Sequence, residues 1–352
     1  MKKSASHIFW RFLLVWALLF HGLTTFAFAA PQPCQFGVMI GGKGQAPQFV
    51  NAMKDLGASC VRMNCRLKDK DHEFDRYLDA GIDMVITFDN SDPSNMSTEY
   101  GTLKEWPNAG FPYRSKEAYQ KRIREVLMPL KPFLASGRKI WAQCENEIGD
   151  ASINPKSRYW RGTTEQYLEQ LQAFREAVES VSPSIPVVLT SFPSESLSAL
   201  IDNGNPHHEY ADRHLTKLLK SPDAKVLDLH FYGSVDEISA KVKAVRDRAP
   251  KNKPFLWICT ENGGPDFRSK DTPISWKQDK EKFEQIQATQ VSQRLLACSH
   301  NGAQLCLWFS LMDLKKETDA FSHLGLLDQD VLPPRKKPSY VAFKTFIASQ
   351  KK

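Results

Sequence analysis

Several common functional motifs are missing from this chain of 352 residues. It has no GxSxG nucleophile elbow, which argues against a typical serine esterase, and no CxxC pair, which leaves a zinc ribbon or thioredoxin-type redox site unsupported. The nearest approach to a phosphate loop, IGGKGQAP at 40–47, has neither the GxGxxG nor the GxxxxGK[ST] order. Basic residues cluster only in PRKKP at 334–338 and in the final KK. We therefore expect no nucleic-acid partner and no cofactor or metal.

Long hydrophobic runs are scarce, and the longest lies at the N-terminus. Lys2, Lys3 and Arg11 precede FLLVWALLF, and the small-x-small triplet AFA follows at 27–29. This order predicts a secretory signal peptide over residues 1–29, because the run is short and interrupted for a membrane span. An uncleaved anchor is the alternative. We expect residues 30–352 to form one catalytic domain, secreted or periplasmic, without membrane contact after cleavage, and monomeric.

Charge and cysteine are also modest. Three of the formal charges of +7 come from the basic residues of the predicted signal peptide, which leaves a net charge of +4 for the remainder. Seven cysteines is an odd number for an exported protein. Most lie in apolar, strand-like runs, so the simplest interpretation is buried free thiols that pack as small hydrophobic side chains. A Cys34–Cys60 disulfide is the open alternative.

Short apolar runs alternate with longer helical patterns along the chain. The strand-like runs are 36–40, 59–64, 83–88, 139–144, 186–190, 225–232, 254–260 and 303–310. The helical patterns cover 46–57, 72–81, 115–134, 163–181, 236–249, 277–299 and 338–348, with a less regular one at 194–220. Strands of nearly continuous apolarity are typical of sheets buried on both faces. Eight of them, each followed by helical sequence, predict a single α/β domain, a (β/α)8 TIM barrel. A doubly wound open sheet is the alternative, although it would usually carry a glycine-rich turn after its first strand.

Function in such a barrel gathers at the carboxyl ends of the strands. Two glutamates, Glu147 after the fourth strand and Glu261 after the seventh, would face each other across this mouth. Opposed carboxylates are the apparatus of glycoside hydrolysis, in which one is protonated to assist the leaving oxygen and the other is ionised. Taken alone, each glutamate has a simpler interpretation, as an acidic residue of a solvated loop or as a helix cap.

Three short motifs resemble a known group of enzymes. ENE at 145–147, HFY at 230–232 and CTENG at 259–263 are similar to motifs of the clan A retaining glycoside hydrolases, and the resemblance to the cellulase-like members spans roughly residues 33–349. Those enzymes are (β/α)8 barrels whose acid/base is a Glu directly after Asn on strand four. Their nucleophile is a Glu that ends strand seven.

The resemblance implies a role for each matching residue. Glu147 would be the general acid/base and Glu261 the nucleophile. Five further residues would serve the substrate or the carboxylates: Asn146 by bonding the sugar's 2-hydroxyl, Arg62 by keeping Glu261 ionised, Tyr232 by orienting it, His230 by lining the same subsite and Trp308 as a platform beneath the sugar. Core packing is the alternative for Trp308.

The chain also departs from the family pattern. Strand three ends in TFDNSD, where many relatives carry a His, so Asp89 or Asn90 would have to substitute. An extra acid, Glu145, precedes the Asn–Glu pair, and we expect a supporting role for it at most.

Two further features leave alternatives open. Aromatic residues of the expected mouth loops could stack on sugar rings or equally pack the loops together: Tyr100, Trp106, Phe111, Tyr113, Tyr159, Trp160, Phe267 and Trp276. His208 and Asp212 could share a helix face near a metal, but their spacing misses the zinc-protease pattern. The leading hypothesis is an exported retaining β-glycosidase acting on a carbohydrate, and its rival is a catalytically silent barrel that binds glycans.

Overall fold

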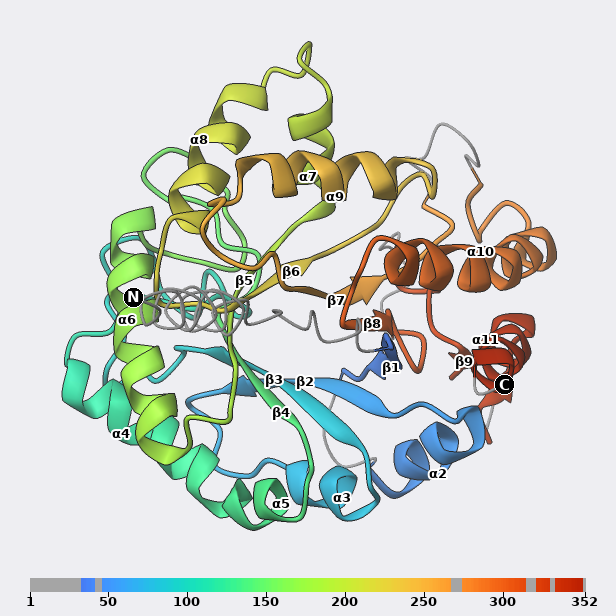
Figure 1. Ribbon diagram of the computed structural model, residues 1–352, viewed down its shortest axis with the longest axis horizontal. Helices are drawn as coiled ribbons and strands as arrows, with labels where there is room; N and C mark the ends of the chain where they lie inside the picture. The colour runs from blue at the N-terminus through green and yellow to red at the C-terminus, as the bar shows by residue number, and fades with distance from the viewer. Residues whose placement is uncertain (1–32, 42–45, 267–273, 315–320, 330–332, 351–352) are drawn as a thin grey trace, which may run out of the picture. The chain divides into compact units, whose positions relative to one another are not determined.

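A computed structural model describes residues 33–41, 46–266, 274–314, 321–329 and 333–350. Eight parallel strands close into a barrel in chain order, and helices surround it (Figure 1). The strands are β1 (Gln35–Met39), β2 (Cys60–Arg66), β3 (Asp83–Asp89), β4 (Ile140–Cys144), β5 (Val187–Phe192), β6 (Val226–Leu229), β7 (Trp257–Asn262) and β8 (Leu305–Trp308). The predicted (β/α)8 barrel is thus confirmed. The predicted signal peptide lies outside the described residues.

The helices follow the predicted pattern with local differences. They are α2 (Ala46–Leu56), α3 (Phe74–Asp79), α4 (Lys116–Leu127), α5 (Lys131–Ala135), α6 (Thr164–Val181), α7 (Ser194–Ile201), α8 (His208–Leu219), α9 (Glu237–Arg248), α10 (Lys280–His300) and α11 (Pro338–Gln350). The helix expected over 115–134 is divided by a 3-10 turn at Met128–Leu130, where Pro129 cannot donate a backbone hydrogen bond. A two-stranded sheet of β9 (Leu327–Asp328) and β10 (Arg335–Lys336) was not predicted.

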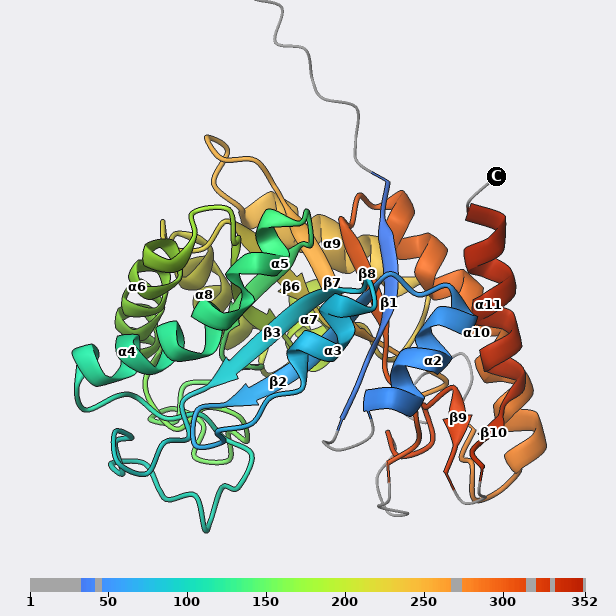
Figure 2. The same ribbon diagram turned by 90° about the horizontal axis from the view of Figure 1, so that it is seen from below.

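Local sequence explains where several helices begin and end. Thr163 and Gln166 form a reciprocal capping box at the start of α6, which satisfies two backbone donors. Gly81 ends the turn after α3 with a φ of +84°, a conformation that glycine adopts without strain. The last helix closes the ring against the first described one. The Tyr340 hydroxyl of α11 donates to Asp55 of α2 at 2.8 Å, and Figure 2 shows the two helices side by side.

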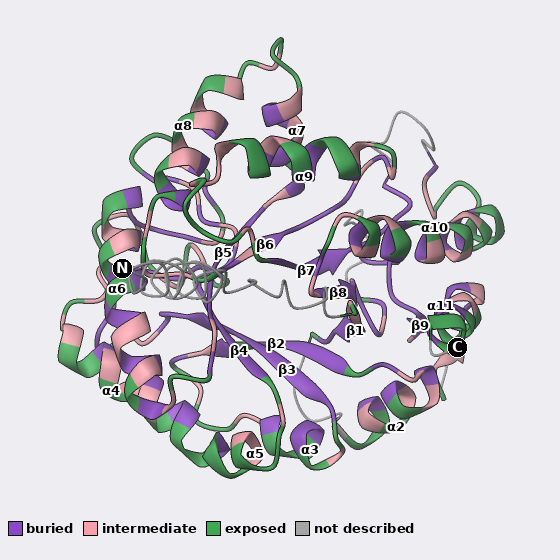
Figure 3. Cartoon of the chain, viewed as in Figure 1, coloured by how far each residue is buried: buried purple, intermediate pink, exposed green. Residues whose placement is uncertain are grey.

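The strands are buried while the outer faces of the helices are exposed (Figure 3). Inside the barrel, side chains form two layers of opposite character. The apolar layer comprises Cys60, Val85, Trp141, Val188, Val226, Ile258, Leu305 and Leu307. Two residues further along five of these strands lie the members of a polar layer: Arg62, Thr87, Gln143, Asp228 and Thr260, each with no exposed surface. Since side chains alternate with a period of two, both layers point into the barrel.

Two irregularities place the residues at the barrel mouth. The register between β7 and β8 shifts between Cys259 and Asn262, so Glu261 joins the inward face although Thr260 precedes it. After β4, Glu145 and Glu147 adopt left-handed backbone conformations, with φ of 62° and 40°. Such conformations are costly for residues other than glycine and concentrate at functional sites.

The seven cysteines all lie in the described residues and are thiols, so the Cys34–Cys60 disulfide considered above is absent, and six of the thiols are buried. Within the described ranges, no helix is both long enough and apolar enough to span a membrane.

Candidate active site

Glu147 and Glu261 meet at the barrel mouth, as the sequence predicted. One oxygen of each carboxylate and one nitrogen of His230 lie within 4.8 Å of one another. Both glutamates line a cleft of about 870 Å³, together with Asn146 and Tyr232. The two carboxyl groups therefore share one small site that is open to a ligand.

Glu261 is held in the ionised form from two sides. Its Oε1 pairs with the buried guanidinium of Arg62, and its Oε2 accepts a hydrogen bond of 2.6 Å from the Tyr232 hydroxyl. Burial alone would raise the pKa of Glu261, but the positive charges of His230 and Arg62 and these hydrogen bonds lower it below its usual value. Glu261 is thus the ionised member of the pair.

Glu147 has the opposite electrostatic environment. Burial, the largest influence, and the nearby charge of Glu261 raise the pKa of Glu147, while a contact of 2.7 Å with His230 Nδ1 partly offsets that rise. The pKa of Glu147 remains raised and that of Glu261 remains lowered. Two acids whose pKa values are pushed apart can divide the roles of proton donor and nucleophile.

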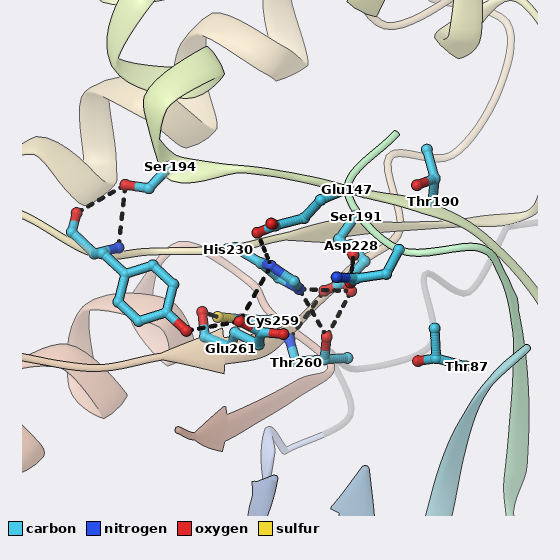
Figure 4. A network of polar contacts seen from close by, with 12 residues as sticks. Thr87, Glu147, Thr190, Ser191, Ser194, Asp228, His230, Cys259, Thr260 and Glu261 are labelled. Atoms are coloured by element: carbon cyan, nitrogen blue, oxygen red, sulfur yellow. Dashed lines mark hydrogen bonds and ion pairs between the residues drawn. The ribbon is translucent and has the colours of Figure 1, made fainter. Parts of the chain in front are cut away.

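His230 links this pair to the interior of the barrel (Figure 4). Its Nε2 lies 3.2 Å from Asp228 Oδ2 and 3.0 Å from Thr260 Oγ1. Burial would lower the pKa of His230, but Glu261 and Asp228 raise it to about 10. The imidazole is therefore a cation at neutral pH. A protonated imidazole has no free lone pair, so the trio with Glu147 and Glu261 is suited to proton handling rather than to binding a metal.

The polar layer beneath the site is a continuous hydrogen-bonded network. Thr87 Oγ1 accepts from Arg62 Nε at 2.9 Å and donates to Gln143 Oε1 at 2.6 Å. Gln143 Nε2 donates to Asp228 at 2.7 Å, and the Thr260 hydroxyl donates to the same carboxylate at 2.6 Å. Because each member has a partner, the network is rigid and fixes Arg62 and His230 under the two glutamates. Gln143, Asp228 and Thr260 were not predicted as site residues. Each lies two positions after an inward-facing apolar residue of its strand, which is the signal that could have indicated an inward side chain.

Asn146 lines the cleft beside Glu147. Its Oδ1 accepts from Arg62 Nη2 at 2.6 Å and from the Ser191 hydroxyl at 2.8 Å. Since the oxygen already has two donors, the amide nitrogen is the group that Asn146 can offer to a ligand.

Arg62 and His230 lie beneath the cleft rather than along it. Both are wholly buried, Arg62 contacts Glu261 and His230 contacts Glu147. This agrees with the expected role of Arg62 as the partner of Glu261. For His230, the expected position along the subsite is wrong, because its ring lies under Glu147 in the polar interior.

The expected sugar platform at Trp308 is also wrong. Its indole is fully buried, and Nε1 donates to the Leu324 carbonyl at 2.8 Å. Leu305 and Leu307 face the barrel interior, so alternation turns Trp308 outward toward the core beneath the helices. The next residue, Phe309, lines the cleft and meets Tyr232 edge-on at a centroid distance of 5.9 Å. Phe309 is the aromatic ring that this strand offers to a ligand.

Glu145 points away from the cleft. Its Oε1 accepts from the Asn90 backbone at 2.9 Å and from Gln170 Nε2 of α6 at 2.7 Å, and its Oε2 has no hydrogen-bond partner among the described residues. Burial and the charge of Asp89 raise its pKa well above the usual value. The supporting role predicted for Glu145 agrees with this position, which holds the β3 loop against α6.

At the end of β3, the two candidate replacements for the family's His differ. Asp89 lines the cleft, and burial raises its pKa to about 7. Asn90 instead donates to the Phe111 carbonyl at 2.8 Å. Asp89 is therefore the residue of this strand that can meet a ligand.

Most of the mouth aromatics pack against protein. Phe111 and Trp160 are fully buried, and Trp276 stacks on His323 at a centroid distance of 3.7 Å. Tyr159 does line the cleft, and Tyr210 and His214 join it without having been predicted. Phe267 lies outside the described residues.

The possible metal ligands His208 and Asp212 do not converge. His208 Nδ1 lies 2.8 Å from the Ala199 carbonyl oxygen, and Asp212 pairs with Arg248. The second group of ligand-type residues in the described chain is Cys259, Cys298 and Cys306, behind β7.

The electrostatics of Glu261 give a testable pH dependence. The nucleophile role expected for Glu261 requires an ionised carboxylate, so we expect activity to rise as the pH passes the pKa of Glu261. Arg62 lowers that pKa; we therefore expect Arg62→Gln to raise it and to move the acid limb of kcat/KM to higher pH. The limb should stay in place in Arg66→Gln, because Arg66 lies at the cleft but pairs with Asn108. An acid limb that is unchanged in Arg62→Gln would contradict this role.

Comparison with known proteins identifies the fold. No protein-family model matches the sequence, and no curated protein matches it. A glucosidase from Croceicoccus marinus aligns with a TM-score of 0.60 at 13% identity, over 91% of this chain and 68% of that one. A family 39 glycoside hydrolase from Bacteroides cellulosilyticus WH2 aligns with a TM-score of 0.58 at 13% identity, over 90% of this chain, which spans only 64% of that one. The GH53 catalytic domain of Ignisphaera aggregans aligns with a TM-score of 0.52 at 17% identity, over 90% and 91% of the two chains. The chain thus has the (β/α)8 fold seen in these glycoside hydrolases, which is the fold that the resemblance to clan A implied.

Proposed function

We propose that this protein is a retaining β-glycosidase that hydrolyses a poly- or oligosaccharide. The observation that carries the proposal is the closeness of two carboxylates with opposed pKa shifts, Glu147 and Glu261, in one open cleft. Retaining enzymes hold their carboxyl groups about 5 to 5.5 Å apart, whereas inverting enzymes need about 6.5 to 9.5 Å to admit a water molecule. One oxygen of Glu147 and one oxygen of Glu261 lie within 4.8 Å of each other, which supports the shorter separation and hence retention.

In the first step, Glu261 attacks the anomeric carbon as Glu147 donates its proton to the departing glycosidic oxygen. The bond from carbon to the leaving oxygen breaks, and an ester bond to Glu261 forms. Tyr232 and Arg62 keep the nucleophile ionised and oriented in the free enzyme. The amide nitrogen of Asn146 would donate to the sugar's 2-hydroxyl, a bond that strengthens in the transition state.

In the second step, Glu147 takes a proton from water, and the resulting hydroxide equivalent displaces Glu261 from the sugar. Loss of its proton in the first step leaves Glu147 anionic beside the cationic His230, which stabilises the anion. His230 thereby helps Glu147 alternate between acid and base. No bound metal or organic group takes part in this scheme.

The carboxylate and amide groups that line the cleft, and the names of the structural neighbours, support a carbohydrate substrate. The neighbour from Croceicoccus marinus is called a glucosidase. Export is part of the proposal and rests on the N-terminal sequence.

The proposal is tested by following product stereochemistry. Aryl β-glycosides and β-glycans of several sugars would be incubated with the enzyme, and the first-formed anomer recorded by proton NMR. We expect the β-anomer to appear first and to mutarotate later. An α-anomer would show inversion, and glycan binding without any hydrolysis would support the silent barrel instead.

A further inference from the structure

A cluster of three thiols lies behind the strand that carries the nucleophile. Cys259 of β7, Cys298 of α10 and Cys306 of β8, here called the thiol cluster, have sulfur atoms that all lie within 4.8 Å of one another. All three side chains have no exposed surface. They are separated by 39 and 8 positions in the sequence (residues 259, 298 and 306), so no short ligand motif reveals them. Packing as small hydrophobic side chains would explain their burial but not the polar groups beside them.

Asn262 is the first of these polar groups. Its carboxamide lies 3.4 Å from the sulfur of Cys298 and 3.5 Å from that of Cys306, through the atom assigned as Nδ2. The other amide atom, Oδ1, is buried without a hydrogen-bond partner among the described residues. Nitrogen and oxygen of an amide are assigned from their surroundings, and a half-turn of the group exchanges them. After that turn, Oδ1 faces the sulfurs.

The second polar group is a buried cation. Arg294 of α10 has no exposed surface, and its charge acts on both Cys259 and Cys298. Its Nη1 also lacks a hydrogen-bond partner within the described chain. The carboxylate of Asp266 also acts on Arg294, and thiolates at Cys259 and Cys298 would add to the negative charge beside this cation.

We propose that the thiol cluster and the carboxamide oxygen of Asn262 form a tetrahedral site for one Zn²⁺ ion. Thiolates are the ligands that select zinc among common divalent cations. With Zn–S about 2.3 Å and Zn–O about 2.1 Å, a tetrahedral site has S···S edges of about 3.8 Å and S···O edges of about 3.6 Å. The amide already lies at such an edge from two sulfurs.

The buried cation also suits a negatively charged site. Binding releases three thiol protons, and three thiolates with Zn²⁺ carry a net charge of −1 beside the guanidinium of Arg294. The ligands come from two adjacent strands and one long helix, which hold their positions as a structural zinc site requires. The ion would therefore fasten α10 to the barrel wall behind β7.

The inference is tested by metal content in the full chain. Protein would be refolded under reducing conditions with excess Zn²⁺, dialysed, and assayed for zinc by mass spectrometry. We expect about one zinc ion per chain in the wild type, and little in Cys298→Ala or Cys306→Ala. Asn262→Ala should bind zinc at least tenfold more weakly. Cys60→Ala is the matched control, because Cys60 is an equally buried thiol of the apolar layer, and it should retain zinc fully.

Binding of Cd²⁺ distinguishes a thiolate site from a site in which carboxylates hold the ion. Refolding with Cd²⁺ should give the near-ultraviolet charge-transfer absorption of cadmium thiolates in the wild type and in Cys60→Ala, but a reduced band in Cys298→Ala. Wild-type protein that retains less than a tenth of an equivalent of zinc, or shows no cadmium–thiolate band, would overturn the proposal. So would zinc content in folded Cys298→Ala equal to that of the wild type. These wild-type measurements decide the question even if a cysteine variant does not refold.

Discussion

Replacing Glu261 with glutamine is expected to lower kcat/KM for any hydrolysed glycoside by about 10⁵-fold, equivalent to about 7 kcal/mol of transition-state stabilisation. Glutamine preserves the shape of the side chain but cannot form the covalent ester with the anomeric carbon. It also leaves Arg62 without the carboxylate that it contacts. The measurement is initial rate on the best substrate found in a panel of β-glycans and aryl β-glycosides.

The control for this variant is Glu281→Gln, which changes an exposed glutamate in the first turn of α10. It should retain wild-type rates. Activity of Glu261→Gln within tenfold of the wild type would remove Glu261 from the nucleophile role. Unchanged glycan affinity in the inactive variant would show that the loss lies in the chemistry.

Replacing Glu147 with glutamine should produce a loss that depends on the leaving group. A positioned general acid contributes about 10²- to 10⁴-fold, and we expect a loss of this size for unactivated glycans. Aryl glycosides with acidic phenols need little protonation, so formation of the glycosyl-enzyme from them should be slowed far less. Their turnover would then be limited by hydrolysis of that intermediate, which is measured as a burst of released phenol in pre-steady-state kinetics.

Glu145→Gln is the matched control for Glu147, since it removes a carboxylate two positions away. Glu145 contacts Asn90 and Gln170 rather than the cleft, so we expect less than a tenfold change in kcat/KM. The acid assignment is wrong if Glu145→Gln abolishes turnover on unactivated glycans while Glu147→Gln does not.

The fold could be predicted because its signals are periodic and local. Eight apolar runs separated by helical patterns specify a barrel, and all eight runs match strands of the structure. What sequence reasoning missed depended on small departures from regularity. Pro129 interrupts the helix expected over 115–134, and the short β9–β10 pair has only two residues in each strand. Neither feature has enough residues to give a periodic signal.

The candidate site was predicted in its main parts for a different reason. Residues at strand ends must meet at the mouth, so Glu147, Glu261 and Tyr232 came together as expected. Errors arose where an expected role depended on which face a side chain occupies. The prediction for Trp308 was wrong because Leu305 and Leu307 occupy the inward positions of β8, and alternation then turns Trp308 outward. The outward direction of the Glu145 side chain could not be predicted from strand alternation, because it depends on a left-handed backbone conformation.

The shifted register of β7 makes the protein unusually sensitive to chain length at this point. Between Cys259 and Asn262 the strand exchanges its faces, which sends Glu261 toward the mouth and Asn262 toward the thiols of β8 and α10. A single inserted or deleted residue here would exchange the surroundings of Glu261 and Asn262. The carboxylate would then lie among the sulfur atoms, and the amide would lie opposite Glu147. No single substitution could then restore both the residues that face the mouth and those that face the thiols. The loops at the mouth lie beyond this strand, so their length can vary without exchanging the two faces of β7. We therefore expect length variation among homologous chains to fall in the mouth loops and to spare this segment.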